Sequence, residues 1–165
     1  MRCIAAFDIG TTAVKAMLVG YDGQVFISFS QDIPTIFEGD HKEQDPNEWW
    51  QAFCKLSRDM KVQCPELDVS GIVMSGQMQD VIPVDQDLQP VCPAILYSDG
   101  RAEKEAAELS AAVGEDLILK ITGNHCDGSL SLPKIMWLKK HKPEVFSRTR
   151  CFLISSKDYV IARLT

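Results

Sequence analysis

The feature that most constrains the fold is the pair of apolar runs at the start of the chain. Residues 3–7 are apolar and lead into the polar segment 8–12, and a second apolar run at 14–19 follows at once. Two such runs separated by a short segment containing a glycine predict two strands joined by a tight turn. Gly10 provides the backbone freedom that the turn needs.

The turn itself carries a pattern suited to binding an anion. The backbone N–H groups around Thr11 and Thr12, together with their hydroxyls, predict a concavity that fits a phosphate. Asp8, at the end of the first strand, would repel that phosphate unless a divalent cation lay between them, and Mg²⁺ takes one or two carboxylates plus phosphate oxygens. The pattern therefore predicts a magnesium–nucleotide site, although an ordinary hairpin with an acidic corner has the same residues.

Composition excludes several classes of partner. The chain has 165 residues, of which 45% are hydrophobic, enough for one domain with a core of its own. Its net charge of −6 argues against a nucleic acid or an anionic membrane as the main partner, because both require a basic surface. The six cysteines have no CxxC spacing and are expected to be small core residues of a cytoplasmic protein.

Hydrophobic periodicity and breakers predict a mixed α/β sheet. Asp45 is expected to cap a helix that begins at Pro46, with Glu48 completing a capping box. Residues 32–44 are expected to be irregular. The other predicted strands are 3–8, 13–19, 24–30, a buried strand at 71–74, 81–84, an extended segment at 91–97, and 151–154; the other predicted helices are 101–112, 114–121, one capped by Ser131 that runs to about 141, and one that opens at Ser155 or Ser156. Because the last helix is still running at the end of the chain, we expect a fragment of a longer protein.

Five segments together resemble the amino-terminal part of the FGGY carbohydrate kinases, and most closely their xylulokinase-like branch. The first segment, from Phe7 to Ala16, is shared with relatives of actin, Hsp70 and hexokinase, whereas all five in order are specific. The other four are Glu43–Trp50, Gly71–Asp80, Pro93–Arg101 and the tail from Thr122 to Thr165. The resemblance implies a ribonuclease H-like α/β fold of the actin and hexokinase type, with residues 1–165 forming an incomplete first domain that lacks the carboxy-terminal nucleotide-binding domain.

The resemblance also implies roles for residues of the first turn. Asp8 corresponds to the family's acidic residue that acts through Mg²⁺ near the β- and γ-phosphates of ATP. Gly10, Thr11 and Thr12 correspond to its first phosphate loop. Lys15 follows on the second strand, as a phosphate contact or as a structural or solvated lysine.

The sugar-binding side is implied by the later segments. Met78 and Gln79 lie where the xylulokinase-like branch carries a Met-His pair, and Gln, unlike His, does not titrate near neutral pH. Asp80 stands where the branch usually carries a small residue, as an acceptor for a sugar hydroxyl or as a solvated loop carboxylate. Asp99 and Arg101 match the family's acidic-and-arginine turn near the sugar, although Asp99 also stands where it can cap the next helix.

The implied function is ATP-dependent phosphorylation of a sugar or polyol hydroxyl, with a ketopentose such as D-xylulose as the leading substrate. Ribulose, glycerol, erythritol and gluconate remain alternatives, as do an actin- or Hsp70-like nucleotide switch and a catalytically silent sugar-binding regulator. The partners would be a small sugar and ATP, with a homodimer left open. The family's general base, an aspartate, is expected beyond residue 165, so this chain alone is expected to be inactive.

Overall fold

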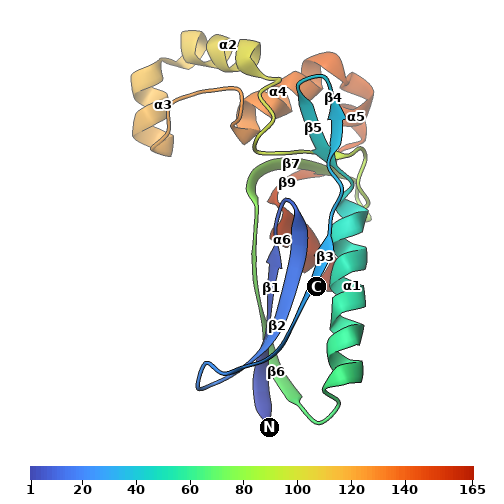
Figure 1. Cartoon of the computed structure of the whole chain (residues 1–165). Coiled ribbons are helices and arrows are strands. Elements are labelled where there is room, and N and C mark those ends of the chain that lie inside the picture. Colours follow the sequence, from blue (N-terminus) through green and yellow to red (C-terminus); the bar gives the residue numbers. More distant parts are fainter.

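A computed structural model describes residues 1–165 and contains two sheets (Figure 1). The first sheet has the strand order β3-β2-β1-β6, in which β1 runs antiparallel to β2 and parallel to β6. Its strands are β1 (Arg2–Ile9), β2 (Ala13–Gly20), β3 (Val25–Asp32) and β6 (Asp68–Gly76). Alternate residues of β1 and β2 are buried on one face, as strand periodicity requires. The predicted pair of hairpins at the start of the chain is confirmed.

The second sheet has the order β4-β5-β8-β7-β9, with every pair antiparallel. Its strands are β4 (Ile36–Glu38), β5 (His41–Gln44), β7 (Met78–Val84), β8 (Ala94–Ile95) and β9 (Cys151–Ser155). The prediction that residues 32–44 are irregular is wrong, because β4 and β5 form a hairpin whose turn contains Gly39 at φ 59°. The first strand of this hairpin has only three residues and the second is polar, so neither gives a clear strand signal in the sequence. Pairing of Glu43 with Ile95 holds the hairpin in the sheet.

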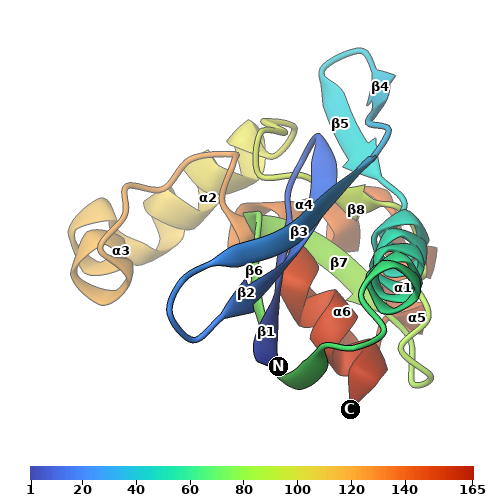
Figure 2. The ribbon, with the colours of Figure 1, turned by 60° about the horizontal axis from the view of Figure 1, so that its bottom comes forward.

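Six helices complete the fold, at α1 (Pro46–Gln63), α2 (Glu103–Val113), α3 (Glu115–Thr122), α4 (Ser131–His141), α5 (Pro143–Arg148) and α6 (Ser156–Leu164). Helices α1 and α6 contact each other and the first sheet (Figure 2). Both helices and strands β1 and β2 contribute residues to the largest apolar cluster. Helices α2 to α5 and the β4–β5 hairpin gather beyond one end of that sheet (Figure 1). No helix combines the length and apolar character that crossing a bilayer demands.

Helix α1 follows its sequence signals closely. The Asp45 carboxylate accepts a hydrogen bond from the Asn47 N–H at 2.9 Å, which confirms the predicted N-cap. A capping box also requires the Glu48 carboxylate to accept a hydrogen bond from the Asp45 N–H, and this bond does not form. Four apolar residues of α1, spaced by four, three and four positions, share one face, as helical periodicity predicts, and all are buried: Trp49, Phe53, Leu56 and Met60.

Two other local predictions are wrong. The strand predicted as buried at 71–74 lies at the edge of the first sheet, where Ile72 and Val73 are 53% and 55% exposed. Ser131 is the first residue of α4 rather than its cap, and its hydroxyl donates to the Asp80 carbonyl at 3.2 Å. Helix α5 was not predicted, and six residues offer little periodicity to detect.

Candidate functional site

Parallel pairing of β1 and β6 brings two polar strand ends to one edge of the first sheet. Asp8 lies opposite Ser75, and Ile9 lies opposite Gly76, although the two segments are far apart in sequence. The chain beyond each end turns away and leaves a cleft of about 320 Å³. Its lining residues are Asp8, Gly10, Thr11, Gly76, Gln77, Met78 and Tyr97. Three predicted site residues of the first turn therefore meet one predicted sugar contact, Met78, in the same cleft.

The two glycines at this edge are required by close approach. A Cβ at Gly10 would lie 3.0 Å from the Ala13 carbonyl oxygen, which accepts the Gly10 N–H at 3.1 Å. A Cβ at Gly76 would lie 2.6 Å from the Ser156 hydroxyl and 3.0 Å from the Ile9 carbonyl oxygen. Side chains at either position would push apart the strand ends that form the cleft.

Asp8 presents a carboxylate to solvent at the base of the cleft. Its Oδ1 accepts a hydrogen bond from the Ser75 hydroxyl at 2.7 Å, and no group of the chain bonds to its Oδ2. Lys15 pairs with Asp8 across the strands and lines a neighbouring hollow of about 350 Å³ with it. Lys15 thus lies beside Asp8 but outside the cleft.

The Gly10–Thr12 turn leaves backbone donors free. The N–H groups of Thr11 and Thr12 have no hydrogen-bond partner within the chain. The Thr11 hydroxyl is already committed, because it donates to Gln77 Oε1 at 3.0 Å. Thr12 is exposed beside the cleft, and its carbonyl accepts the Ile33 N–H. The free N–H groups are the kind of donors that bind phosphate oxygens.

Met78 and Tyr97 also line the cleft. Met78 is 62% exposed and Tyr97 is 42% exposed. Gln79 follows at the rim, exposed and in the left-handed backbone region at φ 64°. Gln77 and Tyr97 are site residues that the sequence analysis does not single out. They lie within the segments Gly71–Asp80 and Pro93–Arg101, but only the fold shows that both line the cleft.

The remaining predicted sugar contacts lie elsewhere. Asp80 is fully buried and does not line the cleft, so the alternative of a solvated loop carboxylate is wrong. Asp99 is also fully buried, and the alternative that it caps the next helix is wrong, because α2 has Ala102 at its cap and no side-chain cap bond. In this structure neither carboxylate can touch a ligand in the cleft.

Asp99 and Arg101 form a buried clamp between the loop before α2 and strand β5. Arg101 donates to both carboxylate oxygens of Asp99, at 2.9 and 2.7 Å, and its Nη1 lies 2.8 Å from Glu43. Burial alone would raise the pKa of Asp99, but hydrogen bonds from Arg101 and from the Lys42 N–H outweigh it and lower the pKa below its ordinary value. This arrangement is a structural ion pair of the bidentate kind.

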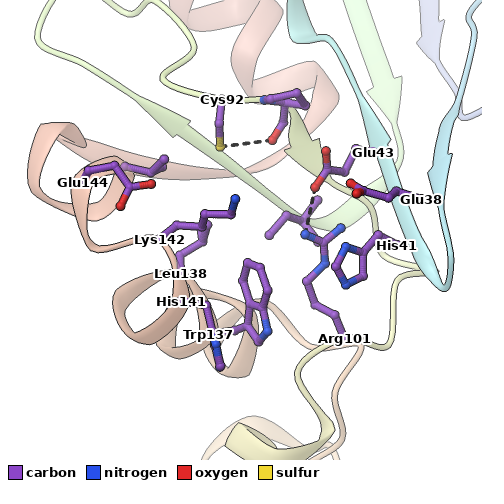
Figure 3. Close-up of a pocket in the computed structure, with 13 residues that line it drawn as sticks. Glu38, His41, Glu43, Cys92, Arg101, Trp137, Leu138, His141, Lys142 and Glu144 are labelled. Atoms are coloured by element: carbon purple, nitrogen blue, oxygen red, sulfur yellow. Dashed lines mark hydrogen bonds and ion pairs between the residues drawn. The ribbon is translucent and has the colours of Figure 1, made fainter.

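Arg101 faces a second pocket, of about 370 Å³, on the other side of this clamp (Figure 3). Figure 3 shows it between the β4–β5 hairpin and the end of α4, with His41, Glu43 and Trp137 around the guanidinium. The guanidinium carbon lies 4.9 Å from the centre of a Trp137 ring. Arg101 is therefore placed away from the cleft that holds Asp8.

Comparison with known proteins gives a consistent result over nearly the whole chain. Residues 3–165 match the sequence model described as FGGY family of carbohydrate kinases, N-terminal domain. A xylulose kinase of Bacillus subtilis is 38% identical over 170 residues, which cover 100% of this chain and 33% of that protein. The chain thus spans about a third of the length of such relatives.

Solved structures agree on the fold. The crystal structure of xylulose kinase from Rhodospirillum rubrum matches with a TM-score of 0.92 at 29% identity, covering 97% of this chain and 33% of that one. A gluconate kinase from Lactobacillus acidophilus matches with a TM-score of 0.87 at 27% identity, covering 98% of this chain and 33% of that one. These matches and the mixed sheet confirm the predicted ribonuclease H-like α/β fold of the actin and hexokinase type.

Proposed function

Since the chain belongs to the FGGY family of carbohydrate kinases, we propose that it is the amino-terminal domain of a two-domain enzyme that transfers the γ-phosphoryl group of ATP to a sugar hydroxyl. The observation that carries this proposal is the composition of the cleft. Asp8, Gly10 and Thr11 line the cleft together with Met78 and Tyr97, which we call the sugar wall, and the unbonded N–H groups of Thr11 and Thr12 belong to the same turn. Groups that bind phosphate beside groups that can contact a small polar molecule are what phosphoryl transfer requires.

Asp8 would hold Mg²⁺ on the phosphates. The fit is good, because its Oδ2 is unbonded, the carboxylate is exposed, and Mg²⁺ in such sites keeps several waters and needs only one or two protein carboxylates. The metal, when bound, neutralises charge that develops on the transferred phosphoryl group. Ser75 bonds to Oδ1 of the carboxylate, so that Oδ2 would be free to hold the cation.

The phosphate loop would bind through its backbone. The N–H groups of Thr11 and Thr12 donate to phosphate oxygens, while Gly10 allows the turn to approach them closely. Lys15 lies beside Asp8 and would add positive charge near the phosphates without lining the cleft. These groups position the nucleotide, which is the main contribution a protein makes to this chemistry.

The sugar would lie against Met78, Gln79 and Tyr97. Relatives named xylulose kinase support a ketopentose such as D-xylulose as the preferred substrate. The Gln79 amide has two donors and one acceptor for sugar hydroxyls and keeps the same charge at every physiological pH. Because a gluconate kinase is also similar to this chain, ribulose, glycerol, erythritol and gluconate belong in the same test.

The test measures ADP release with ATP and Mg²⁺ by the two-domain protein and by this chain, side by side, over that panel of sugars. We expect sugar-dependent release by the two-domain protein only, its abolition by removal of Mg²⁺, and a loss of about 100-fold in Asp8→Asn, the order seen when an electrostatic group of an active site is removed. Asp40→Asn, at an exposed turn, is the matched control.

Other outcomes separate the alternatives. ADP release that is independent of every sugar would contradict the proposal and favour a nucleotide switch. Sugar binding without ADP release, measured by calorimetry on the same protein, would instead favour a catalytically silent regulator.

A further inference from the structure

Directly behind the sugar wall lie two fully buried residues of opposite charge, Asp80 on β7 and Lys134 on α4. Asp80 Oδ1 accepts the N–H of Tyr97 at 3.0 Å. The Lys134 ammonium donates to the carbonyl of Leu96 at 2.7 Å and to that of Gln79 at 3.3 Å. Both charged groups therefore bond to the backbone of residues that form or adjoin the sugar wall.

The backbone that they hold is under constraint. Gln79 is one of two non-glycine residues with positive φ, a conformation that L-residues adopt only when their surroundings impose it. Its carbonyl points to Lys134, and the next carbonyl, that of Asp80, accepts the Ser131 hydroxyl at 3.2 Å. The first turn of α4 thus fixes the backbone of Gln79 and Asp80.

Packing alone does not explain two buried charges at this place. The Asp80 Oδ2 has no hydrogen-bond partner, and the Lys134 ammonium bonds to the backbone carbonyls of Leu96 and Gln79 rather than to a carboxylate. Burial raises the pKa of Asp80 to about 7, against the lowering effects of the Tyr97 bond and of Lys134. Burial also lowers the pKa of Lys134 to about 8, while Asp99 and Asp80 act to raise it. Apolar residues of similar volume would avoid this desolvation cost.

We propose that Lys134 and Asp80 are positioning residues that fix the backbone of Gln79 and Tyr97, and thereby set the affinity of the cleft for its sugar. This inference rests on the proposed function, because it assigns the sugar to the wall that these backbones form. Neither side chain touches the cleft, so both act through the residues they hold.

The kinetic test uses the two-domain protein with four variants. Lys134→Met removes both bonds from the ammonium, and Asp80→Ala removes the acceptor for the Tyr97 N–H. We expect each to raise the KM for D-xylulose about tenfold, the order expected for one lost hydrogen bond to a charged group, with the KM for ATP within twofold of wild type. Asp80→Asn keeps the acceptor and should restore a KM near that of wild type. Lys139→Met, at an exposed position of α4, is the matched control.

A second measurement needs no activity. Amide hydrogen exchange should show the Tyr97 N–H exchanging about tenfold faster in Asp80→Ala than in wild type, with the amides of α1 unchanged and protection returning in Asp80→Asn. An unchanged Tyr97 exchange rate, or a parallel rise in the KM for ATP and for sugar, would overturn the inference. If the wild type phosphorylates no sugar, the proposed function fails, and the exchange experiment still decides whether Asp80 holds Tyr97.

Discussion

Gln44 is the residue on which the phosphate loop depends most. It is fully buried, and its amide uses its whole hydrogen-bonding capacity. Nε2 donates to the Thr11 carbonyl at 2.6 Å and to the Thr35 hydroxyl at 3.0 Å. Oε1 accepts from Trp49 Nε1 at 3.1 Å and from Gln77 Nε2 at 2.9 Å. Gln44→Met keeps the length of the side chain and removes all four bonds.

The expected cost follows from the partners that the substitution leaves behind. Thr35 is half-buried and its hydroxyl can bond to water instead, so the loss of its hydrogen bond costs little free energy. Trp49 is completely buried and Gln77 is 9% exposed, so their donors lose a partner that water cannot replace. The Thr11 carbonyl loses the hydrogen bond that it accepts from Gln44, but Thr11 is half-buried and its carbonyl can bond to water instead. At about 1–3 kcal/mol for each of these two unsatisfied buried donors, the total is about 2–6 kcal/mol. A domain stability of about 5–15 kcal/mol makes this a large fraction.

Urea denaturation of the chain, followed by circular dichroism, measures this cost directly. Gln51→Met is the matched control, because Gln51 is exposed on α1 and its replacement should change the free energy of unfolding by no more than about 0.5 kcal/mol. A loss of less than about 1 kcal/mol in Gln44→Met would refute the reasoning, since it would mean that the loop finds other partners.

Three further predictions concern stability, each measured by urea denaturation. Asp45→Ala should lose about 1 kcal/mol, because the Asn47 N–H loses its cap; an unchanged midpoint would contradict this. Arg101→Met should lose about 3 kcal/mol, because it leaves the Asp99 carboxylate buried without its partner; a loss no larger than that of an exposed substitution would argue against the clamp. Burial raises the pKa of Asp80 to about 7, so the neutral carboxyl stabilises the fold at low pH and that stability is lost as the pH rises through about 7. Asp80→Asn should therefore equal wild type near pH 4 and exceed it at pH 8 by up to about 4 kcal/mol, whereas a difference that does not grow with pH would exclude this coupling.

The sequence predicts those elements whose signals are local. The predictions of the turn after Asp8 and of the start of α1 at Pro46 are confirmed. Their signals, a glycine, a capping carboxylate and a periodic apolar face, each act within a few residues. The β4–β5 hairpin was missed because β4 has only three residues and β5 is polar, and pairing with β8, some fifty residues away, supplies the stabilising bonds.

The residues of the candidate site likewise differ in whether their signals are local. Asp8, Gly10 and Thr11 are predictable from one short pattern. Gln77 is not, because its role depends on the parallel pairing of β1 with β6, which brings it beside Thr11. The burial of Asp80 could not be predicted either, since a carboxylate in a polar loop is equally compatible with exposure to solvent. Its burial depends on α4, which packs against this segment.

The chemistry of the cleft also bears on what the chain can do alone. Phosphoryl transfer to a sugar requires that the hydroxyl proton be removed, and a positioned base contributes about 10²–10⁴-fold to such a step. Asp8 is the one carboxylate that lines the cleft, and no histidine lines it. A carboxylate that binds a metal on the phosphates cannot also approach the sugar hydroxyl as a free base. If the proposed function is correct, the base must therefore come from outside the residues of this cleft, and we expect a carboxylate of the second domain to supply it. Addition of that domain to the chain should then restore sugar-dependent ADP release, whereas turnover by the chain alone would place the base within residues 1–165.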